Sequence, residues 1–182
     1  LVELLKELPD QGVEIAVNDE TLEIQLSYSA GNYSFVGIPS AQYPSFEADK
    51  DSEPISFSLA TQQLIEGLDN TLFAVSDDEY RRIMQGVLLK VSEDHICMVA
   101  TDTRKLVRFI DRRTAPGVSG SCVIPAKPSA ILKNVFAKEE TLNITMTSRS
   151  AIIESENYTF QCTFLNGNYP DFERVIPRNN TN

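Results

Sequence analysis

Alternating apolar and polar residues predict β-strands along most of this chain. In residues 21–27, Leu22, Ile24 and Leu26 fall on one face and polar side chains fall on the other, as in an antiparallel strand with one buried face. We expect antiparallel sheets. The other segments with strand character are residues 13–17, 33–38, 55–59, 86–91, 96–101, 106–110, 121–124, 142–147, 151–154 and 158–164.

Three segments instead carry apolar residues at helical spacing, namely residues 1–8, 60–73 and 126–136. The expected core faces are Leu1, Leu4, Leu5 and Leu8 in the first helix, Leu64, Ile65, Leu68 and Leu72 in the second, and Ile131, Leu132, Val135 and Phe136 in the third. The chain starts inside the first helix and without a methionine, so we expect it to be a piece of a longer protein.

An internal repeat relates residues 1–46 to residues 131–172. Each copy has a Leu-rich or apolar helix, alternating strands, and then Asn-Tyr-Ser-Phe at 32–35 or Asn-Tyr-Thr-Phe at 157–160. Both copies close on Tyr-Pro-x-Phe, at 43–46 and at 169–172, and residues 57–60 and 123–126 form a weaker pair. The repeat predicts an α+β fold of repeated strand–helix–strands units, with two copies in residues 55–177 and the second half of an earlier pair in residues 1–46.

Composition narrows the class of protein. An apolar fraction of 42% supports a packed core, while the net charge of −10 disfavours tight binding of nucleic acid through charge alone. The sequence has no leader and no apolar run of membrane-spanning length, so we expect a cytoplasmic protein without a membrane partner. Its three cysteines, Cys97, Cys122 and Cys162, are expected to be buried and reduced.

No residue pattern indicates catalysis, a metal site or a cofactor. The single histidine, His95, lies in a polar turn, and no serine or cysteine has the setting of an activated nucleophile. The acidic run 77–79 is better explained by helix capping than by metal ligation, because Ser76 and Glu79 have the spacing of a capping box that opens a helical turn at 79–84.

Three motifs carry a resemblance to a known family. The run Val-Ala-Thr-Asp-Thr-Arg-Lys-Leu at 99–106, the segment Gly-Asn-Tyr-Pro-Asp-Phe-Glu-Arg-Val-Ile-Pro at 167–177, and Ile-Pro-Ala-Lys at 124–127 resemble signatures of the bacterial DNA polymerase III beta subunit, the replication sliding clamp. Thr103, Arg104 and Lys105 stand where the family commonly has Gly or Ser, His and Arg, and Ala126 stands where Arg is usual. The resemblance covers the whole chain.

The resemblance implies a DNA-clamp fold and a role as a processivity factor. Family members have three similar domains per subunit, and two subunits close head to tail around duplex DNA. Residues 1–50 would then be the second half of the first domain, residues 53–177 the complete middle domain, and residues 178–182 the start of a linker to a third domain. The family's partners are the polymerase III catalytic subunit, the clamp loader and other clamp-binding proteins. The acidic total fits a ring that holds DNA by encircling it.

The resemblance also implies two surfaces. The middle-domain wall of a partner-peptide cleft would be Met84, Thr101, Thr103, Arg104, Lys105, Leu106, Pro170, Arg174 and Val175. The residues facing DNA would be Arg81, Arg82, Lys127, Lys133, Asn134 and Lys138. Without the resemblance, Leu106 and Val175 are better interpreted as ordinary core. Two other classes stay open: a protein-interaction scaffold of the same repeat unrelated to DNA, and an enzyme with a substrate pocket between the repeats.

Overall fold

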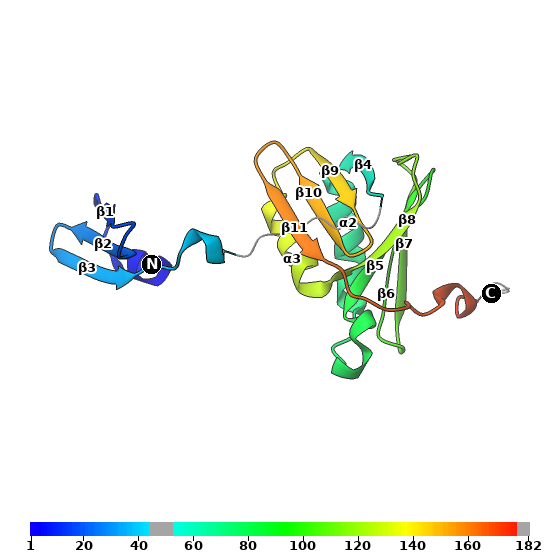
Figure 1. The fold of residues 1–182 in the computed structure, drawn as a ribbon. Helices are drawn as coiled ribbons and strands as arrows, with labels where there is room; N and C mark the ends of the chain where they lie inside the picture. Colours follow the sequence, from blue (N-terminus) through cyan, green and yellow to red (C-terminus); the bar gives the residue numbers. More distant parts are fainter. Residues whose placement is uncertain (44–52, 178–182) are drawn as a thin grey trace. The chain divides into compact units, whose positions relative to one another are not determined.

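The structure, a computed structural model, describes residues 1–43 and 53–177. The chain divides into two compact units, residues 1–46 and 47–182 (Figure 1). Most of the polar run 47–54 lies outside the described residues, as do residues 44–46 of the first Tyr-Pro-x-Phe and the tail 178–182.

The first unit is a three-stranded antiparallel sheet with one short helix. Its elements are α1 (Val2–Glu7), β1 (Glu14–Val17), β2 (Glu23–Tyr28), β3 (Gly31–Val36) and the 3-10 turn η1 (Ser40–Gln42), with strand order β1-β2-β3. Two strands are shifted from their predicted bounds. Leu22 has a left-handed φ of 58°, so β2 begins only at Glu23. The Gly37 amide donates to the Leu22 carbonyl at 2.7 Å. The tight turn after Tyr28 starts β3 at Gly31, earlier than the sequence pattern suggests.

The second unit contains two four-stranded antiparallel sheets and two main helices. Its elements are β4 (Ile55–Ala60), α2 (Thr61–Thr71), η2 (Leu72–Ala74), η3 (Glu79–Met84), β5 (Gly86–Val91), β6 (Ile96–Thr101), β7 (Leu106–Asp111), β8 (Gly120–Pro125), α3 (Ala126–Val135), β9 (Thr141–Met146), β10 (Ser150–Glu154), β11 (Thr159–Thr163) and η4 (Phe172–Arg174). The strand orders are β11-β10-β9-β4 and β7-β6-β5-β8. The α+β fold expected from the repeat is confirmed.

Helices α2 and α3 pack against one face of the β7-β6-β5-β8 sheet, which is called its inner face. Helix α2 contacts β6 and β7, α3 contacts β5 and β8, and the two helices contact each other (Figure 1). Leu132 and Phe136 of the third predicted helix face are buried, each 1% exposed. Ile131 was predicted to lie in the core and does not, because its side chain is 42% exposed. Its place on the helix, one residue before Leu132, turns it away from the sheet.

The outer face of the second sheet is covered as well. Leu88, Val99 and Val123 project from it and pack with Phe172, which lies in the segment that follows β11. Because both faces are covered, every residue of β6 is buried. The segment 165–176 is held near the sheet by the Leu165 amide, which donates to the Val123 carbonyl at 2.9 Å. This outer layer positions the candidate site.

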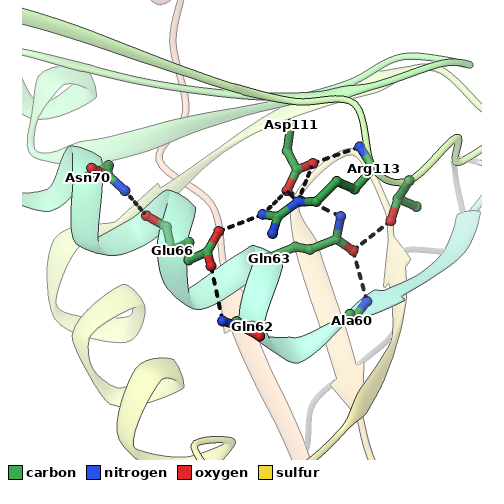
Figure 2. A network of polar contacts seen from close by, with 8 residues as sticks. Ala60, Gln62, Gln63, Glu66, Asn70, Asp111 and Arg113 are labelled. Atoms are coloured by element: carbon green, nitrogen blue, oxygen red, sulfur yellow. Dashed lines mark hydrogen bonds and ion pairs between the residues drawn. The ribbon is translucent and has the colours of Figure 1, made fainter.

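A polar network joins α2 to the end of β7. Asp111 is 4% exposed, and its carboxylate accepts from the guanidinium of Arg113 and from Gln63 Nε2 at 3.2 Å (Figure 2). Arg113 Nη2 also reaches Glu66 at 2.5 Å. Paired in this way, the buried carboxylate is satisfied, and it anchors the helix to the sheet.

The predicted capping box at the start of η3 is wrong. Asp78 is the N-cap residue, and its carboxylate accepts from the Tyr80 amide at 2.9 Å. The Ser76 hydroxyl accepts instead from the amide of Asp78 at 3.1 Å, and Ser76 lies two residues before the N-cap position. The two hydrogen bonds follow each other along the chain, so the acidic run is a capped turn, as the sequence suggested, but with a different capping residue.

Candidate docking site

The turn between β6 and β7 is fixed by its own side chains. The Thr101 hydroxyl donates to the Lys105 carbonyl at 2.8 Å and accepts from the Thr103 amide at 3.1 Å. The Asp102 carboxylate accepts from the amides of Arg104 and Lys105, each at 2.9 Å, and pairs with Lys105 Nζ at 2.9 Å. These hydrogen bonds hold the pKa of Asp102 well below its ordinary value. The turn is therefore held in one conformation.

Thr103 occupies a conformation that its side chain disfavours. Its φ is 79°, in the left-handed region that β-branched residues avoid. Its hydroxyl accepts from Arg81 Nη1 at 3.0 Å, and Arg81 Nε lies 3.4 Å from the Asp78 carboxylate. The turn is thus linked to η3, the element that carries Met84.

A hollow of about 370 Å³ lies between this turn, the end of η3 and the segment after β11. It is lined by Met84, Thr101, Thr103, Arg104, Lys105, Leu106, Pro170, Asp171, Phe172 and Val175. The structure therefore brings together eight of the nine residues predicted for the cleft wall. The ninth, Arg174, is not among them: its side chain is 85% exposed and its Nε pairs with Asp171 at 2.7 Å.

Two lining residues were not predicted, Asp171 and Phe172. Both belong to the Tyr-Pro-Asp-Phe motif that the repeat had already marked, so their continuity with Pro170 was the available signal. Phe172 is 7% exposed and packs with Leu88, Val99 and Val123 in the cluster on the outer face of the sheet, here called the outer-face cluster. Asp171 places a carboxylate at the rim beside the cationic residues Arg104 and Lys105.

The exposure of Val175 decides between a core and a surface role. Its side chain is 67% exposed, so it is not a core residue. Leu106 is half-buried and packs against the outer-face cluster. An exposed valine beside a half-buried leucine, Met84 and Pro170 gives the hollow an apolar surface open to solvent, which suits the insertion of apolar side chains.

A larger hollow of about 710 Å³ is lined by residues 164–173 together with residues of β5 and β8. Its wall is dominated by polar groups, among them Lys90 and Glu173, which pair across it at 3.8 Å. The smaller hollow has the more apolar wall, so it is the better candidate for docking an apolar anchor.

The residues predicted to face DNA lie on η3, on α3 and directly after α3. Lys127 and Asn134 are exposed on α3, and Arg81 and Arg82 are exposed on η3. Lys138 is exposed and follows α3, which ends at Val135. The remaining cation, Lys133, contacts Asp69 of α2 through an ion pair. That ion pair offsets its charge.

The described residues contain no cluster of three or more His, Cys, Asp or Glu side chains that could hold a metal ion. None of the helices in residues 1–43 and 53–177 is long and apolar enough to cross a membrane. All three cysteines are buried and free, as predicted. Burial raises the pKa of the Cys162 thiol to about 11, which makes this group a poor nucleophile near neutral pH.

Comparison with known proteins identifies the family. Residues 58–171 match the family model of the DNA polymerase III beta subunit, central domain. The chain is 30% identical over 178 residues to a beta sliding clamp of Bacillus subtilis, covering 97% of this chain and 46% of that protein. It is 27% identical to a beta sliding clamp of Synechococcus elongatus, covering 98% of this chain and 48% of that protein. The chain thus spans about half the length of the curated relatives it matches.

Solved structures agree with this likeness. The DNA polymerase III beta chain of Streptococcus pneumoniae matches with a TM-score of 0.85 and 29% identity, over 98% of this chain and 47% of that chain. The sliding clamp of Bacillus subtilis matches with a TM-score of 0.82 and 27% identity, over 97% of this chain and 46% of that chain. The family model matches more than half of the chain, so this chain belongs to the DNA polymerase III beta subunit family, with the family's central domain at residues 58–171.

Proposed function

We propose that this chain is part of a processivity factor of DNA replication: a subunit of a ring that encircles duplex DNA and tethers the replicative polymerase. The observation that carries the proposal is the grouping of eight expected cleft residues around one apolar hollow, in a chain of the beta subunit family. In this proposal residues 1–50 are the second half of a first clamp domain, residues 53–177 are the middle domain, and residues 178–182 begin the linker to a third.

The hollow would accept a short peptide from a partner protein. Leu106 and Val175 offer apolar contact to a Leu or Phe side chain, and Met84 can adapt its shape. Arg104 and Lys105 at the rim would attract acidic residues or a terminal carboxylate. Such a site suits the polymerase III catalytic subunit, the clamp loader and other clamp-binding proteins, which would share it by presenting similar peptides.

Charge supports a topological hold on DNA. The chain carries a net charge of −10, and the ion pair between Lys133 and Asp69 removes one cation from the proposed DNA side. Tight DNA binding requires several phosphate contacts from Lys or Arg. A ring that closes as a homodimer needs only weak contacts, and weak contacts allow it to slide. The protein would act in the cytoplasm and without catalysis of its own.

A linearisation experiment tests this function. The intact protein, loaded by its clamp loader on a nicked circular plasmid, should co-elute with the plasmid in gel filtration. Cutting the plasmid once should release it, because a ring slides off a free end. Retention on linear DNA would contradict encirclement and indicate a site of true DNA affinity.

The chain of residues 1–182 gives a second test. By itself it should bind duplex DNA negligibly at physiological salt in fluorescence anisotropy, and it should sediment mainly as a monomer. Sub-micromolar DNA binding would argue against a topological hold. A tight dimer would place the subunit contact within this chain.

A further inference from the structure

Thr103 is a strained residue in the wall of the docking hollow, and one side chain from another element holds it. A β-branched residue with a φ of 79° costs free energy, so this conformation persists only when its surroundings fix it. Hydrogen bonds within the turn fix the backbone around it through Thr101 and Asp102. The side chain of Thr103 is fixed by Arg81, whose Nη1 donates to its hydroxyl at 3.0 Å.

Arg81 is well placed for this task. It interrupts the helical geometry of η3, with φ −117° and ψ 52°, and its Nε lies 3.4 Å from the carboxylate of Asp78, the N-cap residue of η3. One edge of the guanidinium is therefore directed to its own turn and Nη1 is directed to Thr103. Met84, three residues further along, lines the same hollow as Thr103.

Two of the three segments that form the hollow, η3 and the β6–β7 turn, are thus joined by one hydrogen bond. The Met84 wall belongs to η3 and the Leu106 wall belongs to the β6–β7 turn, and Arg81 connects them through Thr103. We propose that Arg81 is a positioning residue for the docking hollow, which sets the spacing of these two walls by holding Thr103. This inference rests on the proposed function of the hollow, and it assigns Arg81 a role in peptide binding without contact to the peptide.

The test compares peptide affinity and turn dynamics in the intact protein. Arg81→Ala and Thr103→Ala each remove the hydrogen bond, one with a change of charge and the other without. Each should weaken binding of a short synthetic peptide with Leu and Phe anchors by roughly three- to tenfold in calorimetry, the effect of one side-chain hydrogen bond. The double variant should bind no worse than the weaker single variant, because both changes remove the same interaction.

Amide hydrogen exchange without peptide supplies a second readout. Amide exchange of residues 103–106 should be faster in Arg81→Ala and in Thr103→Ala than in the wild type. Thr103→Ser keeps the hydroxyl, so it should keep the slow exchange and the affinity of the wild type. Arg112→Ala, which removes an exposed cation from the loop after β7, should change neither.

The outcomes separate this inference from the proposed function. If the wild-type protein binds no peptide, the proposed function fails and this inference fails with it. If the wild type binds and Arg81→Ala weakens binding while Thr103→Ala does not, Arg81 acts on the peptide directly and the positioning role is overturned. Additive losses in the double variant would overturn it as well.

Discussion

The two copies of the internal repeat have similar sequences and very different surroundings. In the second copy, β9 pairs with β4, and Leu142 and Ile144 are 0% and 2% exposed. In the first copy, the corresponding strand β1 pairs with β2 alone, and Ile15 and Val17 are 47% and 58% exposed. Among the described residues 1–43, Leu26 alone is buried.

This difference teaches that one half of the unit does not build its own core. The second copy is covered by the strand–helix half that precedes it, because β4 adds to its sheet and α2 packs against α3. No described residue of the first unit plays that part. Its apolar face stays exposed although its alternation is as clean as that of the buried copy.

The largest expected effect comes from the same substitution in both copies. Ile144→Ala should lower the free energy of unfolding by about 2–5 kcal/mol, because it leaves a cavity in the hydrophobic core cluster that contains Ile144. Ile15→Ala should cost less than about 1 kcal/mol, since nearly half of that side chain is already exposed. Urea unfolding of the chain followed by circular dichroism measures both. Equal costs would mean that Ile15 is buried in solution.

The docking hollow belongs to the second unit, so a change there should have no counterpart in the first unit. Leu106→Ser combined with Val175→Ser should weaken peptide binding to the intact protein by roughly 2–4 kcal/mol, because two apolar contacts are lost. Val36→Ser is the matched control, since Val36 is 74% exposed and Val175 is 67% exposed. Calorimetry should find the control unchanged and Arg104→Ala weakened less, because rim charges mainly tune rates.

A loss of fold would confuse that result at Leu106, which is half-buried. Val175→Ser alone avoids the difficulty because its side chain is largely exposed. Wild-type affinity in a folded double variant would refute the docking assignment.

Breaking an ion pair should also cost more stability in the second unit than in the first. Arg113→Ala leaves the carboxylate of Asp111 buried without its main partner, and should cost about 1–3 kcal/mol. Lys6→Ala in the first unit removes an exposed pair, whose side chains are 67% and 92% exposed, and should cost almost nothing.

Arg113→Ala should also change how the stability of the protein depends on pH in acid. Hydrogen bonds from Arg113 lower the pKa of Asp111 below its ordinary value of 3.8. The ionised carboxylate therefore stabilises the folded protein above pH 3.8, and this stabilisation is lost as the pH falls through the lowered pKa. Arg113→Ala should flatten the stability profile below pH 4 in acid titrations. An unchanged profile would show that the Arg113 contact contributes nothing.

The smallest effect concerns the tyrosines that open the two Tyr-Pro-x-Phe motifs. Burial raises the pKa of Tyr169 to about 12, and its hydroxyl donates to the Val99 carbonyl at 3.4 Å, whereas Tyr43 is 82% exposed. Since the folded pKa exceeds the ordinary value of 10.0, stability should fall as the pH rises from about 10 to about 12. Ultraviolet titration should contain a late-ionising component that Tyr169→Phe removes and Tyr43→Phe leaves in place.

Much of the site was predictable because its residues sit in two short motifs. The β6–β7 turn and the Tyr-Pro-Asp-Phe segment both stood out in the sequence, and the fold brings them to one hollow. Arg174, which the resemblance implied for the cleft wall, does not line the hollow because its exposed side chain pairs with Asp171, and its role in the cleft stays a prediction. Ile131 was misplaced because a position next to Leu132 lies at the border of the apolar face, and the sequence does not specify how far that face extends around the helix.

The sequence by itself determined the strands, the helices and the repeat, because their alternation and spacing are local properties of the backbone. It also determined the family, through motifs of adjacent residues. The tertiary structure alone decided which apolar faces are buried, since burial depends on a covering element distant in sequence. It alone decided that Arg81 meets Thr103, because that contact joins two turns separated by strands β5 and β6.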